Sequence, residues 1–229
     1  MFPLYDDNPS RTKPIVTWTL IIANVIVFLY EITSGRFEQL VIRYGVVPLR
    51  ILHGKALYTL FTSMFLHADF LHLLGNMVYL FIFGDNVEDN FGHLKFLFLY
   101  ILFGLAGAFL HIFMALNSGN PVELKIPAIG ASGAISGVLG AYVVFFPRAR
   151  VITAVLYFYL IQLVAIPALY FIGFWFILQL IYASLGSITG IAAWAHVGGF
   201  IAGALIALIY KPYVKEWKIE EFEEWEYYY

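Results

Sequence analysis

The chain has 229 residues and a formal net charge of −2, and 62% of its residues are hydrophobic while only 12% are charged. This composition is too apolar for a soluble domain and predicts a polytopic membrane protein. The balanced charge, without a polybasic block, argues against nucleic acid and anionic substrates as partners. Because the chain has no cysteine, disulfides, a thiol nucleophile and a cysteine-based zinc site are excluded.

Six apolar runs approach the length of about 20 residues that a membrane-spanning helix requires. Residues 1–13 before them are polar and acidic, unlike a signal peptide, so we expect the first run to remain in the mature protein. The sequence therefore predicts an all-α bundle of six transmembrane helices, the fourth of which is short. The runs are Pro14–Ile32, Phe65–Phe83, Leu94–Leu116, Ser132–Phe146, Pro167–Leu185 and Ile191–Tyr210.

Three further segments need separate interpretation. The connector over residues 34–60 mixes arginine, lysine and glycine with apolar residues, and we expect it to form a small element at the membrane surface. Residues 84–93, GDNVEDNFGH, are interpreted as a solvated charged turn, since their acidic residues lack the spacing of a calcium loop. The apolar stretch 151–185 is interrupted by Pro167 and fits either an interfacial helix followed by one span or two spans.

The distribution of lysine and arginine near the span ends indicates the orientation. With six spans and a cytosolic N-terminus, Lys125 is the basic residue left outside, apart from those of the long connector. We therefore expect both termini to be cytosolic. The basic residues then placed inside are Arg11, Lys13, Lys95, Arg148, Arg150, Lys211, Lys215 and Lys218.

Polar residues inside the spans are candidates for function, because they are costly in lipid. Counted from the outer face, the second span carries His72 and Asn76, the fourth begins at Ser132, and the sixth carries His196 near its start. At about 1.5 Å per residue, all lie within roughly 15 Å of the outer ends of their helices. Two spans within 151–185 would move His196 to the membrane face opposite Ser132, so their common depth favours six spans.

Taken one at a time, such residues have structural explanations. Serines among glycines are common at close helix contacts, and the spacing from Gly133 to Gly137 fits such a contact, as does the spacing from Gly199 to Gly203. A single histidine in a span is more often a hydrogen-bonded structural group than a reactive one. We assign structural roles to His67, His111 and Ser136.

Taken together, four of the polar residues supply the groups that acyl transfer requires. A serine becomes a nucleophile when a base takes its proton, and histidine suits that task near neutral pH. Ser132 and His196 provide this pair. His72 and Asn76 are four residues apart on one helix face, where both can donate hydrogen bonds to an oxyanion, and a helix start at Ser132 adds a backbone N–H.

Three motifs resemble those of rhomboid intramembrane serine proteases, in the same order and in the expected helices. They are HADFLHLLGN with His72 and Asn76, GASG with Ser132, and AHVGGFIAG with His196. The resemblance covers about residues 14–210. It implies Ser132 as nucleophile, His196 as general base without a third acidic residue, and His72, Asn76 and the Ser132 N–H as the oxyanion hole.

The resemblance also implies a membrane-embedded connector after the first span and lateral substrate access beside the fifth span, which contains Trp175. The chain departs from the family at two places. Tyr58-Thr59 stand where many members have Trp-Arg, and Ser136 stands where some have a tyrosine that stacks on the base. The sequence therefore does not identify the group that orients His196.

We predict a serine endopeptidase that cleaves single-span transmembrane proteins near the outer membrane interface, with lipid as its other partner and without a metal or cofactor. The protease domain is expected over residues 14–210, between a cytosolic segment 1–13 and a cytosolic tail 211–229. Apolar residues recur every three positions in the tail, which predicts a short amphipathic surface helix. We expect a multi-pass protein of a prokaryotic cell membrane.

Two other functions fit parts of the sequence. A catalytically inactive rhomboid-like protein would bind transmembrane helices without cutting them, but such proteins typically lose the serine or the histidine. A small-solute transporter would be expected to show inverted repeats or broken helices, which are not evident. A zinc protease is disfavoured because the sequence has no H-E-x-x-H motif. The sequence leaves the oligomeric state and the physiological substrate open.

Overall fold

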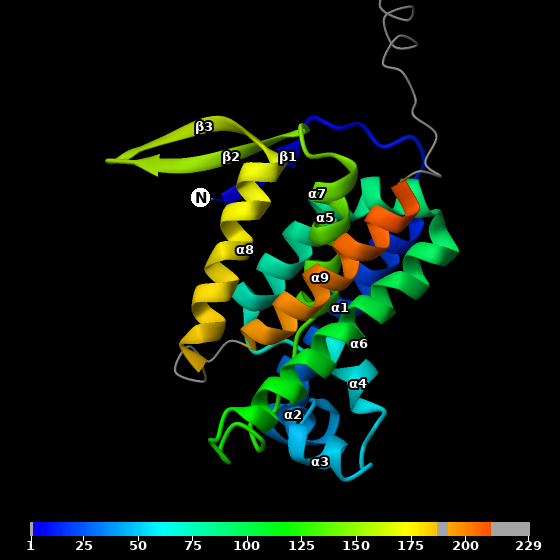
Figure 1. Ribbon diagram of the computed structural model, residues 1–229, viewed down its shortest axis with the longest axis vertical. Coiled ribbons are helices and arrows are strands. Elements are labelled where there is room, and N and C mark those ends of the chain that lie inside the picture. The colour runs from blue at the N-terminus through cyan, green and yellow to red at the C-terminus, as the bar shows by residue number, and fades with distance from the viewer. Residues whose placement is uncertain (1, 187–191, 212–229) are drawn as a thin grey trace, which may run out of the picture.

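The structure is a computed structural model that describes residues 2–186 and 192–211. These residues form a bundle of helices with a small antiparallel sheet at one end (Figure 1). Of the described helices, α1, α5, α6 and α9 are long and apolar enough to cross a membrane, while α7 and α8 have 14 and 17 residues. The bundle helices are α1 (Ile15–Ser34), α5 (Phe70–Phe91), α6 (His93–Asn117), α7 (Ser132–Phe145), α8 (Ala168–Ser184) and α9 (Ala193–Tyr210).

The connector between α1 and α5 folds into short helices at one end of the bundle, which we call the connector end (Figure 1). The hydroxyl of Tyr58 donates to the carbonyl of Arg43 at 3.0 Å, and that of Thr62 donates to the carbonyl of Tyr44 at 2.8 Å. Tyr58 therefore contributes to anchoring the connector. The short helices are α2 (Phe37–Tyr44), α3 (Pro48–Leu52), α4 (Thr59–Thr62) and the 3-10 helix η1 (Ser63–Phe65).

The opposite end carries the sheet, with strands β1 (Phe2–Asp6), β2 (Arg150–Tyr157) and β3 (Leu160–Pro167) in the order β1-β2-β3. We call it the sheet end. Both strand pairs are antiparallel, and β2 and β3 form a hairpin that projects sideways from the bundle (Figure 1). The expected interfacial helix in the 151–185 stretch is therefore wrong, although a single bundle helix, α8, does follow. The all-α prediction missed this sheet.

The hairpin forms because its residues favour extended backbone and find a partner strand. Residues 151–166, VITAVLYFYLIQLVAI, are rich in β-branched and aromatic side chains, which suit a pleated surface. Phe158 adopts a positive φ of 52° between the two strands, as a tight hairpin turn requires. β1, at residues 2–6, pairs with β2, which lies more than 140 residues later in the sequence. A local reading of apolar residues does not reveal that long-range pairing.

The charged segment 84–93 is not the solvated turn that the sequence suggested. Helix α5 continues through it to Phe91, and Gly92, with a φ of 77°, makes the turn into α6. Glu88 in this segment is only 1% exposed. A carboxylate that is buried to this extent requires partners, and the partners lie on α1.

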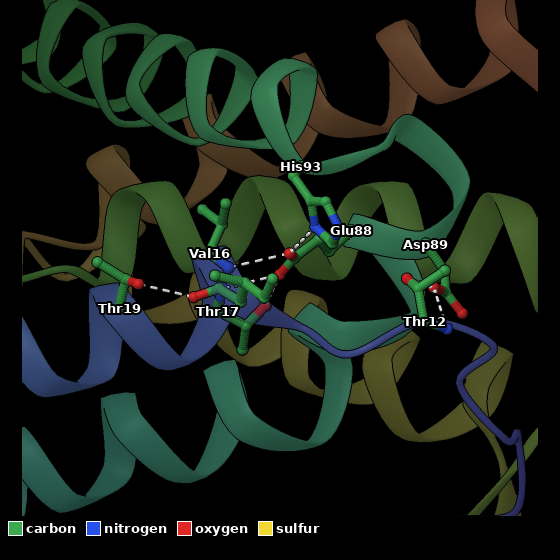
Figure 2. A network of polar contacts seen from close by, with 8 residues as sticks. Thr12, Val16, Thr17, Thr19, Glu88, Asp89 and His93 are labelled. Carbon is green, nitrogen blue, oxygen red and sulfur yellow. Dashed lines mark hydrogen bonds and ion pairs between the residues drawn. The ribbon is translucent and has the colours of Figure 1, made fainter.

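Glu88 caps the start of α1, which has no side-chain cap of its own. Its carboxylate accepts hydrogen bonds from the N–H groups of Val16 at 2.9 Å and Thr17 at 2.8 Å, and from the Thr17 hydroxyl at 2.7 Å. Nδ1 of His93 contacts the same carboxylate (Figure 2). The first N–H groups of a helix have no partner within it, so Glu88 satisfies them from another helix.

Glycines allow α7 and α9 to pack closely. A Cβ atom on Gly199 would lie 1.9 Å from the carbonyl oxygen of Gly133, and one on Gly203 would lie 1.9 Å from that of Gly137. The small-residue contact predicted from the spacing of these glycines is therefore confirmed. It places the first turns of α7 and α9 side by side near the connector end. The surface helix predicted in the tail lies outside the described residues.

Candidate active site

The two residues predicted as nucleophile and base lie at neighbouring helix starts. Ser132 is the first residue of α7, and His196 lies in the first turn of α9. Nε2 of His196 is 2.7 Å from Oγ of Ser132, which is a hydrogen-bond distance. The structure therefore brings together two residues that are 64 positions apart in the sequence.

Gln179 in α8 also contacts His196 and is not among the residues predicted from the sequence. Its Oε1 lies 2.7 Å from Nδ1 of His196. Trp175, one turn earlier on α8, lies with its ring centroid 6.2 Å from that of His196 and its plane tilted by 30°. The available signal in the sequence is a single glutamine within the apolar segment ALYFIGFWFILQLIYAS. It does not by itself indicate which side chain that glutamine meets.

His72 belongs to the first turn of α5 and lies beside Ser132. The backbone N–H of Ala68 donates to its Nδ1 at 3.3 Å, so the proton of the neutral ring lies on Nε2. A Cβ atom on Gly130 would be 2.9 Å from this Nε2 and 3.5 Å from the Ser132 Oγ. Gly130 has a φ of 126°, which glycine adopts without strain. Glycine at this position therefore lets a ring N–H donor lie close to the serine.

Asn76 lies one turn after His72 on the same face of α5. Its side chain is 8% exposed, and its Nδ2 has no hydrogen-bond partner among the described residues. A buried donor without an acceptor costs about 1–3 kcal/mol, so it calls for an explanation. Asn76 lines the same cavity as Ser132 and His196. Its unpaired N–H is therefore available to a group that binds in that cavity.

The start of α7 supplies backbone donors to the same place. The first N–H groups of a helix lack acceptors within it and lie at the positive end of its dipole. No side chain caps this helix start. The N–H of Ser132 is therefore a third donor, besides those of His72 and Asn76, among the residues that line the cavity.

These groups line a cavity of about 600 Å³ between the helices near the connector end. Besides the four predicted residues, it is lined by Gln179 and Trp175 from α8, by Tyr79 from α5, and by His111 from α6. A cavity of this size is sufficient for a short stretch of peptide. Among the described residues, no group of three or more histidines and carboxylates is arranged to hold a metal ion.

The three residues with predicted structural roles, His67, Ser136 and His111, differ in their surroundings. His67 is buried, its N–H donates to Oε2 of Glu31 at 3.2 Å, and its ring packs 5.1 Å from that of His72. The Ser136 hydroxyl donates to the carbonyl of Ser132 at 2.6 Å, which is consistent with a packing role. His111 lines the cavity and therefore lies nearer to the site than the sequence suggested.

Comparison with known proteins places these observations in a family. The family model of the Rhomboid domain matches residues 54–213. The chain is 29% identical over 196 residues to RHOMBOID-like protein 12, mitochondrial, of Arabidopsis thaliana. The matched residues make up 81% of this chain and 55% of that protein. The chain is 28% identical over 215 residues to Rhomboid protease AarA of Providencia stuartii. Here the matched residues make up 85% of this chain and 72% of that protein.

RHOMBOID-like protein 1 of Arabidopsis thaliana is 29% identical over 160 residues, which cover 70% of this chain and 36% of that protein. The chain thus spans 55% of one of these plant relatives and 36% of the other. All candidate site residues fall within the matched domain, and the apolar helices identify an integral membrane protein. By its matched domain and these relatives, the chain belongs to the Rhomboid family.

Proposed function

We propose that this protein is an intramembrane serine endopeptidase in which Ser132 is the nucleophile and His196 is the general base. The observation that carries the proposal is the 2.7 Å hydrogen bond between Ser132 Oγ and His196 Nε2 at the edge of a cavity. A serine hydroxyl paired with an imidazole is the arrangement that makes serine nucleophilic. Family membership and the relative named as a protease support the same reaction class.

The proposed reaction proceeds through an acyl-enzyme. Oγ of Ser132 attacks the carbonyl carbon of the scissile peptide bond while its proton passes to Nε2 of His196. Collapse of the tetrahedral intermediate breaks the C–N bond, and the imidazolium returns the proton to the departing amine. A water molecule then attacks the ester, with His196 again accepting and returning a proton. The serine and the neutral histidine are thereby regenerated.

We assign the oxyanion hole to His72, Asn76 and the N–H of Ser132. The support is geometric: Nε2 of His72 lies next to the serine, and Nδ2 of Asn76 has no partner among the described residues. Donors that are already in place stabilise the negative oxygen of the intermediate without reorganisation. A donor unpaired in the free protein gains its acceptor only when the intermediate forms, so it favours the transition state over the substrate.

We further propose that all the bundle helices span the membrane, giving six spans with both termini in the cytosol of a prokaryotic cell. The short helices α7 and α8 then cross with the help of their neighbours, and α7 is buried by protein along most of its length. The connector end faces outward in this orientation. Single-span transmembrane substrates would be cut near the outer membrane boundary, with α8 and Trp175 beside their path to the site.

The test is labelling with a serine-directed fluorophosphonate in detergent. Wild type is expected to react at Ser132, and Ser132→Ala is expected to lose the label while its thermal stability stays unchanged. Ser118→Ala is the matched control, because Ser118 is an exposed serine at the connector end and outside the cavity. A folded wild type that takes up no label would favour an inactive rhomboid-like protein that only binds transmembrane helices. Equal labelling of Ser132→Ala would show that another residue reacts and that Ser132 is not the nucleophile.

A further inference from the structure

The base of the proposed dyad has a hydrogen-bond partner on each ring nitrogen. Nε2 meets Ser132 Oγ and Nδ1 meets Gln179 Oε1, both at 2.7 Å. Nε2 of Gln179 faces the carbonyl oxygen of Trp175, so the amide oxygen is the group that faces His196. Because an amide oxygen only accepts hydrogen bonds, Nδ1 of His196 carries the proton. In the neutral ring Nε2 is then unprotonated, and its lone pair points toward the serine hydroxyl. This is the tautomer that a base acting on Ser132 requires.

We propose that Gln179 is a positioning residue that fixes the tautomer and orientation of His196. The proposal rests on the proposed Ser132–His196 chemistry and adds a third member to it. In the other tautomer the lone pair of Nδ1 would face the amide oxygen, and a buried hydrogen bond would be replaced by repulsion between two acceptors. An acceptor that is buried without a donor is costly, so the contact with Gln179 favours the productive tautomer.

The bonding of Gln179 itself argues against a purely local structural role. A buried amide in a membrane helix often bonds to its own backbone, as Asn24 does with the carbonyl of Leu20 at 2.7 Å. The corresponding contact of Gln179, from Nε2 to the carbonyl of Trp175, is 3.4 Å long. Its shortest contact goes to the imidazole instead. With 6% exposure, the side chain is also shielded from water that would compete for that bond.

Helix α8 supplies the indole of Trp175 as well as the amide of Gln179. The indole centroid lies 6.2 Å from that of the His196 ring, with the two planes tilted by 30°, so the indole limits rotation of the ring while Gln179 limits its tautomer. Ser132 and His196 come from the tightly packed pair α7 and α9, whereas α8 makes fewer contacts with that pair. The position of α8 therefore determines whether the base keeps both of its supports.

The direct test reads the tautomer and does not depend on activity. Solid-state ¹⁵N NMR of histidine-labelled protein in lipid bilayers separates protonated from unprotonated ring nitrogens, and His196→Gln assigns the signal of His196. Wild type is expected to show Nδ1–H as the main form near neutral pH. Gln179→Met, which keeps the length and removes the acceptor, is expected to raise the fraction with the proton on Nε2. An unchanged tautomer in Gln179→Met would overturn the proposal.

The kinetic test measures the rate of fluorophosphonate labelling as a function of pH, including the pH range in which that rate no longer changes. Gln179→Met is expected to label about 10- to 100-fold more slowly, because a base in the wrong tautomer loses much of its contribution. Gln179→Glu restores an acceptor, so the rate should recover. Its carboxylate also favours the imidazolium, which should move the acidic limb of the rate–pH profile to higher pH. Ser184→Ala, an exposed α8 residue bonded to the Ile181 carbonyl, should label like wild type.

The two tests separate this proposal from the proposed function. If wild type is labelled and Gln179→Met labels at the same rate, Gln179 has no positioning role while the dyad stands. If no labelling occurs but the tautomer still changes in Gln179→Met, the proposed function fails while the positioning holds. A structural role alone predicts lower thermal stability in both Gln179 variants and no rescue by glutamate.

Discussion

Two buried polar clusters lie at opposite ends of the bundle, and they are built differently. At the sheet end the carboxylate of Glu88 accepts bonds from Val16 and Thr17 and contacts His93 (Figure 2). At the connector end Ser132 and His196 border a cavity of about 600 Å³, and the neighbouring Nδ2 of Asn76 has no partner among the described residues. One cluster is saturated with hydrogen bonds, while the other keeps a free donor beside open space.

This difference separates a structural cluster from a candidate reactive one. A buried charge whose acceptors are all occupied stabilises the fold and has no capacity left for a ligand. A buried donor that is left unpaired costs stability in the free protein and gains an acceptor only when something binds. Polarity and burial are common to both clusters, so neither property identifies the reactive one. The unmet hydrogen bonds beside the cavity are what distinguish it.

The largest effect should come from the proposed dyad. Ser132→Ala and His196→Ala are each expected to lower cleavage of a model transmembrane substrate by about 10⁴-fold or more, with thermal unfolding close to that of wild type. The double variant should be scarcely slower than either single one, because the two residues act as a unit. Quantified cleavage on gels, together with circular dichroism melting, checks both parts. Turnover retained in purified Ser132→Ala would contradict the assignment.

The saturated cluster should show the opposite pattern. Glu88→Ala leaves the N–H groups of Val16 and Thr17 without acceptors, and a buried donor that is left unpaired costs about 1–3 kcal/mol. The unfolding free energy should fall by about that amount, and activity should fall only in proportion to the unfolded fraction. Denaturant titration followed by fluorescence measures the loss. Asn90→Ala is the control, since it removes a single contact from Arg11 at the same end.

Asn76→Ala tests whether the unpaired donor contributes to reactivity. Removing one oxyanion donor should lower kcat by about 10²-fold, equivalent to about 2.7 kcal/mol of barrier, with a smaller effect on KM. Stability should not fall, because the amide N–H is unpaired in the free protein. Asn24→Ala is the matched control: Asn24 is buried in α1, and its amide already donates to a carbonyl. It should lose stability and keep its kcat per folded molecule.

The smallest effect concerns a second polar contact at the sheet end. Asp6 of β1 accepts a hydrogen bond from the Tyr142 hydroxyl, and burial is the main cause that raises the pKa of Asp6 to about 7. The folded protein then binds a proton that the unfolded chain releases near pH 4, so stability should decrease as pH rises from about 4 to about 7 and level off above. Asp6→Asn should flatten this dependence and raise Tm most at pH 8.

Melting curves at pH 5 and pH 8 provide the measurement for Asp6. Glu38→Gln serves as a control, because Glu38 is an exposed carboxylate at the opposite end of the molecule. A steeper fall of Tm with pH in Asp6→Asn than in wild type would show that the sign is wrong. Equal slopes in the two proteins would show that the Asp6 carboxyl does not titrate in this range.

Pattern and composition predicted much of the helical core. The predicted run Leu94–Leu116 corresponds to α6 (His93–Asn117), and Pro14–Ile32 corresponds to α1 (Ile15–Ser34), because long apolar runs have few alternatives to a buried helix. The second run was misplaced, since Phe65–Phe83 ends before the charged part of α5. Charge is a poor guide to exposure where a distant helix start, such as that of α1, supplies the partners for Glu88.

The sequence by itself determined the membrane class, the main helices, and the residues proposed as nucleophile, base and oxyanion donors. Their chemistry and their depth along each helix are local properties that can be read from composition and spacing. Only the tertiary structure decided that residues 150–167 form a hairpin with β1, that Glu88 caps α1, and that Gln179 meets His196. The physical reason is that pairing between distant segments depends on packing in three dimensions, which a one-dimensional pattern of residues does not encode.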